Sequence, residues 1–198
     1  ISADGIDVRN YGCPEGLAEM RALFAELLGT DRQNIIAAGN SSLNLMYDTL
    51  ARAMLFAVPG ADRPWSKAEK IRFICPVPGY DRHFFLTASF GIEMINVPML
   101  PTGPDMDQVE ALVASDPSIK GMWLVPVYSN PDGITTSPET CRRLAAMKTA
   151  APDFRLFWDN AYFVHHLYPE NKESVPDIID LCAENGHPDR VFEFASAS

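Results

Sequence analysis

Short apolar runs alternate with segments of helical periodicity along most of this chain. The apolar runs, which we expect to be strands, cover residues 34–38, 71–75, 92–97, 122–125, 154–158 and 190–194. Helices are expected at 14–28, 42–57, 105–114, 138–150 and 176–183, with a further helix ending near residue 90. Such alternation is typical of a parallel sheet covered by helices on both faces. The sequence therefore predicts an α/β fold of three layers, α/β/α, with a mainly parallel sheet.

Composition narrows the class of protein. The chain has 198 residues, of which 47% are hydrophobic and 21% charged, as expected for one globular domain. Its 16 basic and 26 acidic residues give a net charge of −10 without a basic cluster, so no nucleic-acid or membrane partner is expected. No apolar run approaches the roughly 18 residues of a membrane span. Four widely spaced cysteines predict free thiols and a cytoplasmic location.

Polar clusters follow five of the expected strands. Because the carboxyl ends of parallel strands lie at one edge of a sheet, these clusters should face one crevice. A carboxylate, an amide and a phenol in that crevice suit a flat heteroaromatic ligand with one ring nitrogen and one ring oxygen. Asp159 suits a pyridinium N–H, while Asn130 and Tyr162 suit a phenolate. The full set of clusters is 39–42, Tyr80, Asn130, Asp159 with Tyr162, and Ser196 with Ser198.

Each cluster also has a plainer structural interpretation. An Asp after a strand is often a helix N-cap, and the Asn-Pro-Asp-Gly of residues 130–133 is common in turns. The turn at 39–42 before a helix is either an anion site or a simple Ser N-cap. Tyr80 is either a stacking surface for a planar ligand or part of a turn. Five polar clusters on one edge favour a shared ligand site.

The histidines do not predict a metal site. His83 lies near a helix start, and no partner with ligand spacing accompanies it. We expect it to support the site through a hydrogen bond. His165 and His166 have no matching carboxylate or cysteine pattern, and we expect them to be surface or supporting residues.

The order of the motifs resembles the fold-type-I pyridoxal-phosphate enzymes, specifically the class-I-like aminotransferases of the aspartate aminotransferase group. The residues within these motifs are most similar to those of the divergent actinobacterial aspartate aminotransferases, also called MocR-like aminotransferases. The Asn-Pro-x-Gly and Asp-x-Ala-Tyr pair is the strongest signal at this separation, and the Gly-Ser turn alone is the weakest. The motifs that carry the resemblance are residues 11–17, 39–42, 78–80, 129–133, 159–162 and 196–198.

The resemblance implies a role for each residue toward pyridoxal 5'-phosphate. Asp159 would keep the pyridine nitrogen protonated, and Tyr80 would stack on the ring. Asn130 and Tyr162 would hydrogen-bond the ring oxygen. Tyr11 matches a tyrosine that reaches the phosphate of the neighbouring subunit, which implies a homodimer with shared active sites. The implied phosphate-binding residues are Asn40, Ser41, Ser42, Ser196 and Ser198.

Two residues of the family pattern are not in this sequence. The Schiff-base lysine follows a Ser-x-Ser of this kind, so we expect it immediately after Ser198. The arginine that binds the substrate α-carboxylate lies later still in these enzymes. Residues 1–198 are therefore expected to be the pyridoxal-phosphate-binding large domain of a longer protein with an N-terminal arm and a C-terminal small domain. None of Lys67, Lys70, Lys120, Lys148 and Lys172 occupies the place of the lysine.

The resemblance implies transamination between an amino acid and a 2-oxo acid. Aspartate and 2-oxoglutarate are the expected pair, as in the aspartate aminotransferase group. The residues that set substrate specificity lie in a later part of these enzymes. Two alternatives stay open. One is a pyridoxal-phosphate-dependent lyase or decarboxylase, since the fold does not determine the reaction. The other is the cofactor-sensing domain of a transcriptional regulator, which a basic winged-helix segment upstream would favour and a short arm would not.

Overall fold

The computed structural model describes residues 1–10 and 12–197, which divide into two compact units. The smaller unit is Ile1–Ser41 and the larger is Ser42–Ser198. Tyr11 and Ser198, two of the residues expected to bind phosphate, lie outside the described residues.

The smaller unit contains one α-helix, α1 (Ala18–Leu28), and a 3-10 turn, η1 (Arg32–Asn34). The helix ends as predicted at Gly29, whose φ of 70° is left-handed and favours glycine. It begins at Ala18 instead of residue 14. The predicted strand at 34–38 is wrong. Residues 35–39 carry no strand pairing, Ala37 N–H donates to Glu15 O, and Ile36 is exposed. The described residues of this unit include no neighbouring strand with which a ladder could form.

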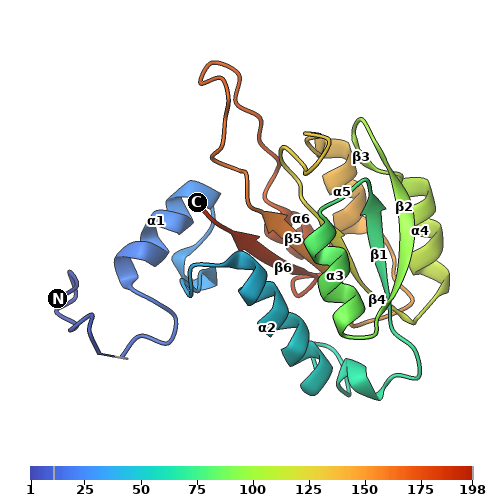
Figure 1. Cartoon of the computed structure of the whole chain (residues 1–198), viewed down its shortest axis with the longest axis horizontal. Helices are drawn as coiled ribbons and strands as arrows, with labels where there is room; N and C mark the ends of the chain where they lie inside the picture. Colours follow the sequence, from blue (N-terminus) through green and yellow to red (C-terminus); the bar gives the residue numbers. More distant parts are fainter. Residues whose placement is uncertain (11, 198) are drawn as a thin grey trace. The chain divides into compact units, whose positions relative to one another are not determined.

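The larger unit is built on a six-stranded sheet in the order β3-β2-β1-β4-β5-β6 (Figure 1). Neighbouring strands are parallel except for β3, which pairs antiparallel with β2. The mainly parallel sheet is as predicted, whereas the two-residue β3 was too short to recognise. The strands are β1 (Arg72–Val77), β2 (Glu93–Leu100), β3 (Gly103–Pro104), β4 (Ile119–Leu124), β5 (Arg155–Asn160) and β6 (Val191–Ala195).

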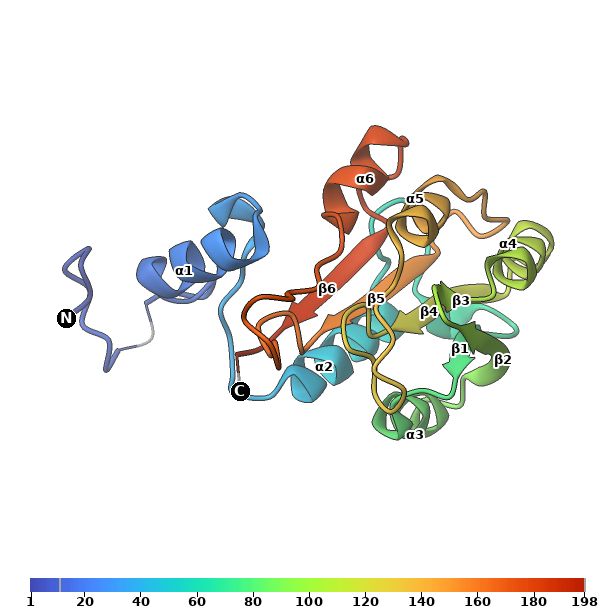
Figure 2. The same cartoon turned by 90° about the horizontal axis from the view of Figure 1, so that it is seen from above.

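Helices cover both faces of the sheet and complete three layers, as Figure 2 shows. On one face lie α2 (Ser42–Leu55) and α3 (Asp81–Ser89), with the 3-10 turn η2 (Trp65–Lys67). The other face carries α4 (Met106–Ser115), α5 (Pro138–Ala146) and α6 (Ile178–Glu184).

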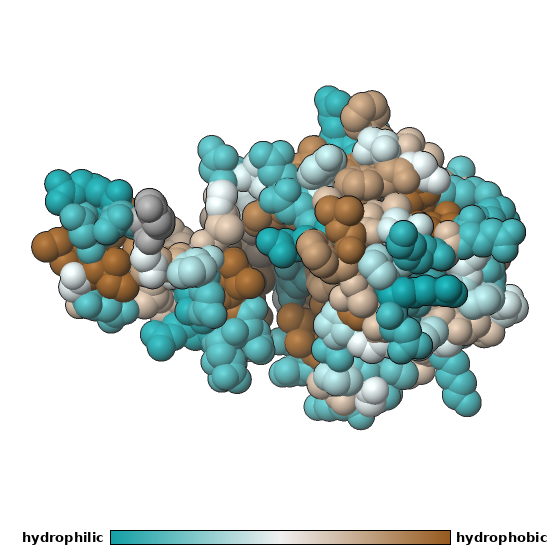
Figure 3. All heavy atoms as spheres, turned by 90° about the horizontal axis from the view of Figure 1, so that it is seen from below, coloured by the Kyte–Doolittle hydropathy of each residue, from teal (hydrophilic) through white to brown (hydrophobic). Residues whose placement is uncertain are grey.

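Each face of the sheet has its own apolar core, because successive strand residues point to opposite faces. In β5, Phe157 packs on the α2/α3 side and Trp158 on the side of α4–α6. Trp65, Phe73 and Trp123 join Phe157 in an aromatic cluster. The surface of this unit mixes polar and apolar side chains (Figure 3). No helix within residues 1–10 and 12–197 has the length and apolarity that a membrane crossing needs.

Candidate active site

Four of the predicted residues lie at the carboxyl ends of β1, β4 and β5: Tyr80, Asn130, Asp159 and Tyr162. The chain runs outward from β1 to β2 and β3, then returns to place β4 on the other side of β1. Such a reversal of strand order is where α/β sheets usually bind ligands. A pocket there is lined by Tyr80 after β1, His83 of α3, Trp123 of β4 and Asn130 in the following loop.

Asp159 is buried in β5, with 3% of its surface exposed. We expected it in a turn after the strand, but β5 continues to Asn160 and pairs with β6 as far as Ala195. No helix begins at Asp159, so the N-cap interpretation is wrong. Its Oδ2 lies 2.9 Å from His83 Nε2. Its Oδ1 is buried and has no hydrogen-bond partner among the described residues.

His83 is held in place from several directions. Its ring stacks on Trp123, with the ring centroids 4.4 Å apart and the planes 12° from parallel. Thr87 Oγ1 donates to His83 O at 2.7 Å and accepts from Trp123 Nε1 at 2.8 Å. The Tyr80 ring meets the imidazole edge to face at 5.1 Å. The expected supporting hydrogen bond of His83 is therefore present, and its acceptor is Asp159.

Asn130 and Tyr162 meet across the neighbouring loops. Asn130 Nδ2 lies 3.4 Å from Tyr162 Oη, a long hydrogen bond that still places amide and phenol side by side. The turn interpretation also holds, because Ser129 N–H donates to Ile134 O and Ile134 N–H to Ser129 Oγ. The turn thus forms the platform that presents the Asn130 amide.

The remaining predicted residues lie at the ends of elements. Tyr80 is half-buried and immediately precedes α3, without a side-chain capping bond. Ser42 is the first residue of α2, the end of a helix at which backbone amides favour an anion. Ser196 directly follows β6, against which α2 packs. Asn40 and Ser41 belong to the smaller unit.

Sequence reasoning missed a pair next to Asp159, formed by the buried Asn160 and the half-buried Glu193. Asn160 Nδ2 donates to Glu193 Oε1 at 2.9 Å, and Asn160 Oδ1 is buried with no partner among the described residues. Burial raises the pKa of the Glu193 carboxyl to about 7; the Asn160 hydrogen bond opposes this shift and the nearby Asp177 charge adds to it. A Glu between two phenylalanines in an expected strand was the signal that could have identified it.

The two adjacent histidines, His165 and His166, contact different tyrosines. His165 is exposed, and its ring packs edge to face on Tyr162 at 5.8 Å. His166 Nδ1 lies 2.9 Å from Tyr128 Oη. Within the part of the chain that the structure describes, no group of three or more His, Cys, Asp or Glu residues is arranged to hold a metal ion.

The arrangement can bind a planar heteroaromatic group. Asp159 Oδ1 offers a buried negative oxygen to a ring N–H, and Asn130 with Tyr162 offers hydrogen-bond donors to a ring oxygen. A buried carboxylate next to a ring nitrogen raises the pKa of that nitrogen and keeps it protonated. The chemistry that this donor set supports is therefore polarisation of a bound pyridine-like ring.

All of residues 1–198 match the family model described as aspartate amino-transferase. A putative aminotransferase from Mycolicibacterium smegmatis is 54% identical over 194 residues, covering 98% of this chain and 45% of the relative. An aspartate aminotransferase from Corynebacterium glutamicum is 51% identical over 197 residues, covering 100% of this chain and 45% of the relative. The chain thus spans less than half the length of these curated relatives.

The fold has a near match among solved structures. A crystal structure of an aspartate transaminase from Corynebacterium glutamicum superposes with a TM-score of 0.95 at 50% sequence identity. The match covers 100% of this chain and 46% of that one.

Proposed function

We propose that this chain, which belongs to the aspartate aminotransferase family, contributes the cofactor-binding large domain of a pyridoxal-phosphate-dependent aminotransferase. The reaction moves an amino group between an amino acid and a 2-oxo acid, with aspartate and 2-oxoglutarate as the proposed pair. Support comes from the 51% identity to a relative named aspartate aminotransferase. The lysine and the arginine that complete the site are expected in the remainder of the protein.

The observation that carries the proposal is the hydrogen bonding of the Asp159 carboxylate, of which only one oxygen has a partner among the described residues. One oxygen is held by His83 at 2.9 Å, and the other is buried without a partner among the described residues. A buried charged oxygen is costly unless something pairs with it. The pyridinium N–H of pyridoxal phosphate is such a partner, so these residues fit the cofactor.

The neighbouring residues fit the rest of the cofactor. When bound, pyridoxal phosphate supplies an electron sink for the charge that remains when the substrate loses its α-proton. We assign Asp159 to holding the proton on the ring nitrogen, and Asn130 with Tyr162 to hydrogen-bonding the ring oxygen. Tyr80 is assigned to stacking on the ring. The phosphate is assigned to the first-turn amides of α2 together with Asn40, Ser41, Ser42, Ser196 and Ser198.

We also propose how the protein is assembled and located. Tyr11 is assigned to the phosphate of the neighbouring subunit, which requires a homodimer with shared sites. The free thiols of the four cysteines suit a reducing cytoplasm.

The test is the visible absorption spectrum of the full-length protein before and after addition of L-aspartate. A cofactor band that falls on addition, with 2-oxo acid formed, is the expected result. A band that ignores aspartate but responds to another amino acid would change the substrate. Absence of any band after incubation with pyridoxal phosphate would contradict the cofactor assignment. Accumulation of a new amino acid from 2-oxoglutarate distinguishes a transaminase from a lyase.

A further inference from the structure

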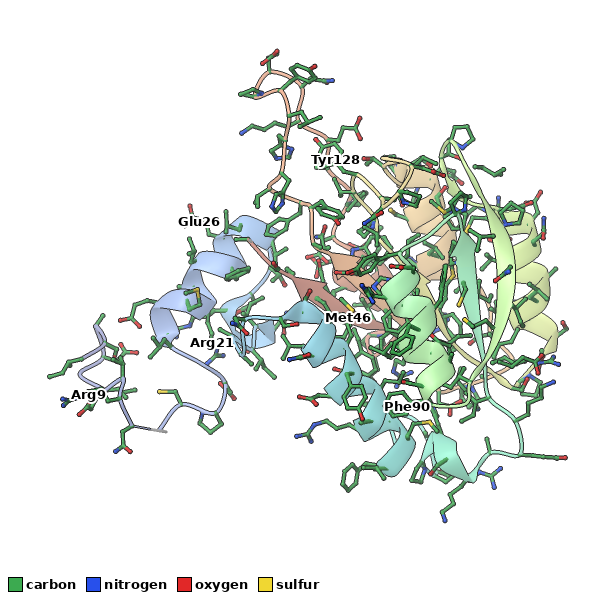
Figure 4. All side chains as sticks on the ribbon, in the orientation of Figure 1. Arg9, Arg21, Glu26, Met46, Phe90 and Tyr128 are labelled. Atoms are coloured by element: carbon green, nitrogen blue, oxygen red, sulfur yellow. The ribbon has the colours of Figure 1, made fainter. Side chains whose placement is uncertain are left out.

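Tyr128 has an unusual backbone conformation. It lies in the loop between β4 and α5, and it is the one non-glycine residue with a positive φ, 50°, in residues 1–10 and 12–197. A bulky residue adopts this conformation only where its surroundings hold it, and such residues concentrate at functional sites. Its own N–H donates to Thr135 Oγ1 at 3.2 Å. The side chain of Tyr128, labelled in Figure 4, extends from this backbone.

The Tyr128 phenol makes two hydrogen bonds to another loop. Glu173 N–H donates to Tyr128 Oη at 3.1 Å, and Oη lies 2.9 Å from His166 Nδ1. Because Oη accepts from the amide, its own proton is available to donate to His166 Nδ1. The two rings also meet nearly at right angles, with centroids 5.9 Å apart.

The loop that Tyr128 holds is long and irregular. It runs from 161 to 177, between β5 and α6, without a helix or strand, and it stands out from the sheet in Figure 1. Ordered loops of this length usually serve a function. Leu167 and Tyr168 in its middle are 87% and 62% exposed, so little packing fixes them. Both described hydrogen bonds between residues 163–176 and the β4–α5 loop end on Tyr128 Oη.

The β4–α5 loop is a firm support by comparison. Thr136 N–H donates to Pro126 O at 2.7 Å, which closes the loop at its base. Ser129 and Ile134 exchange further hydrogen bonds within it. Tyr128 therefore ties a loosely packed loop to a braced one.

The tied loop also carries Tyr162. His165 N–H donates to Tyr162 O at 2.9 Å, and the two rings pack together. The next residue, His166, is the one that Tyr128 holds. Tyr162 Oη in turn lies 3.4 Å from Asn130 Nδ2, two residues beyond Tyr128. The two loops are therefore linked at two points, by Tyr128 with His166 and by Asn130 with Tyr162.

We propose that Tyr128 is a positioning residue that keeps Tyr162 beside Asn130 by holding His166 and Glu173. The role in catalysis rests on the proposed function, because it concerns the end of the site assigned to the ring oxygen. The tie between the loops does not depend on the cofactor. Two measurements on the full-length protein therefore separate the tie from its consequence.

The first measurement is hydrogen exchange at the Glu173 amide and across residues 163–176. Tyr128→Phe keeps the ring but removes Oη, and amide exchange should become at least roughly fivefold faster. Tyr168→Phe is the matched control, because this exposed tyrosine lies on the same loop, and its exchange should match the wild type. Unchanged exchange in Tyr128→Phe would overturn the proposal.

The second measurement is the pH at which the visible absorption of the bound cofactor titrates. Tyr162→Phe sets the size of the effect, and Tyr128→Phe should shift the midpoint in the same direction by a smaller amount. His166→Asn with Tyr128 intact keeps an acceptor near the place of Nδ1, and its midpoint should stay close to that of the wild type. A wild-type midpoint in Tyr128→Phe, despite faster exchange, would reduce Tyr128 to a structural tie and overturn its positioning role. Failure of the wild type to bind pyridoxal phosphate would instead remove the proposed function, while the exchange rates would still report the tie.

Discussion

His83 Nε2 lies 2.9 Å from Asp159 Oδ2, and the same imidazole stacks on Trp123 at 4.4 Å. This relationship joins α3, β4 and β5 at one point and orients a buried carboxylate. Because Oδ2 is taken by His83, only Oδ1 is left to face a ligand. The geometry of the candidate site therefore depends on His83 as well as on Asp159.

Replacing His83 should weaken cofactor binding. His83→Ala leaves Oδ2 of a buried carboxylate without its donor, and a hydrogen bond to a charged group contributes about 1.5–3 kcal/mol. The dissociation constant for pyridoxal phosphate should rise by roughly tenfold or more, as measured by absorption titration of the full-length protein. His83→Gln, whose amide still offers an N–H donor, should recover part of the loss. Equal affinity in wild type and His83→Ala would show that Asp159 does not need this partner.

Replacing Asp159 should abolish most activity without unfolding the protein. In Asp159→Ala the ring nitrogen is no longer held protonated, and turnover should fall by roughly a hundredfold or more. Circular dichroism should remain that of the wild type. Asp153→Asn is the matched control, because Asp153 is also a buried aspartate but pairs with Lys120 near the other end of β5. Near-normal turnover of Asp159→Ala would remove Asp159 from its assigned role.

Much of this arrangement follows from the sequence alone. Alternating apolar and amphipathic segments predict the layers, and the carboxyl-edge rule brings Asn130, Asp159 and Tyr162 together from distant segments. Strand propensity gives the wrong prediction where a neighbouring strand decides whether a segment becomes a strand. Residues 34–38 are apolar enough for a strand but have no neighbour to pair with, whereas β5 extends through Asp159 because β6 pairs with it as far as Ala195.

Side-chain pairings are harder to predict than elements. The partner of His83 lies 76 residues away in the sequence, and nothing in either local pattern links the two. The same holds for Tyr128, whose contacts with His166 and Glu173 depend on the path of a long loop. Periodicity describes which face a residue occupies, whereas a specific hydrogen bond requires two backbones to be placed within a few tenths of an ångström.

The partly desolvated Glu193 carboxyl should make stability depend on pH. Its folded pKa of about 7 lies above the ordinary value of 4.5, so the folded state binds this proton more tightly than the unfolded state does. The contribution is therefore fully present below about pH 4.5 and is lost as pH rises to about 7. Glu193→Gln cannot ionise and should be more stable than the wild type at pH 8, with the difference shrinking toward pH 5. Urea unfolding of both proteins from pH 5 to pH 8 measures the difference in their free energies of unfolding. Parallel pH profiles would contradict a raised pKa for Glu193.

Arg190 should be a major determinant of stability without affecting chemistry. It is 5% exposed, and its Nη1 donates to Leu144 O at 3.2 Å and Ala145 O at 2.8 Å, near the end of α5. Burial lowers the pKa of this guanidinium, yet the carbonyls at a helix C-terminus favour a positive charge. Arg190→Ala leaves these buried carbonyls without donors and should cost about 2–4 kcal/mol in urea unfolding. Arg142→Ala removes an exposed pair with Glu139 and should cost less than about 1 kcal/mol. Equal losses in the two variants would mean that the Arg190 contacts do not stabilise α5.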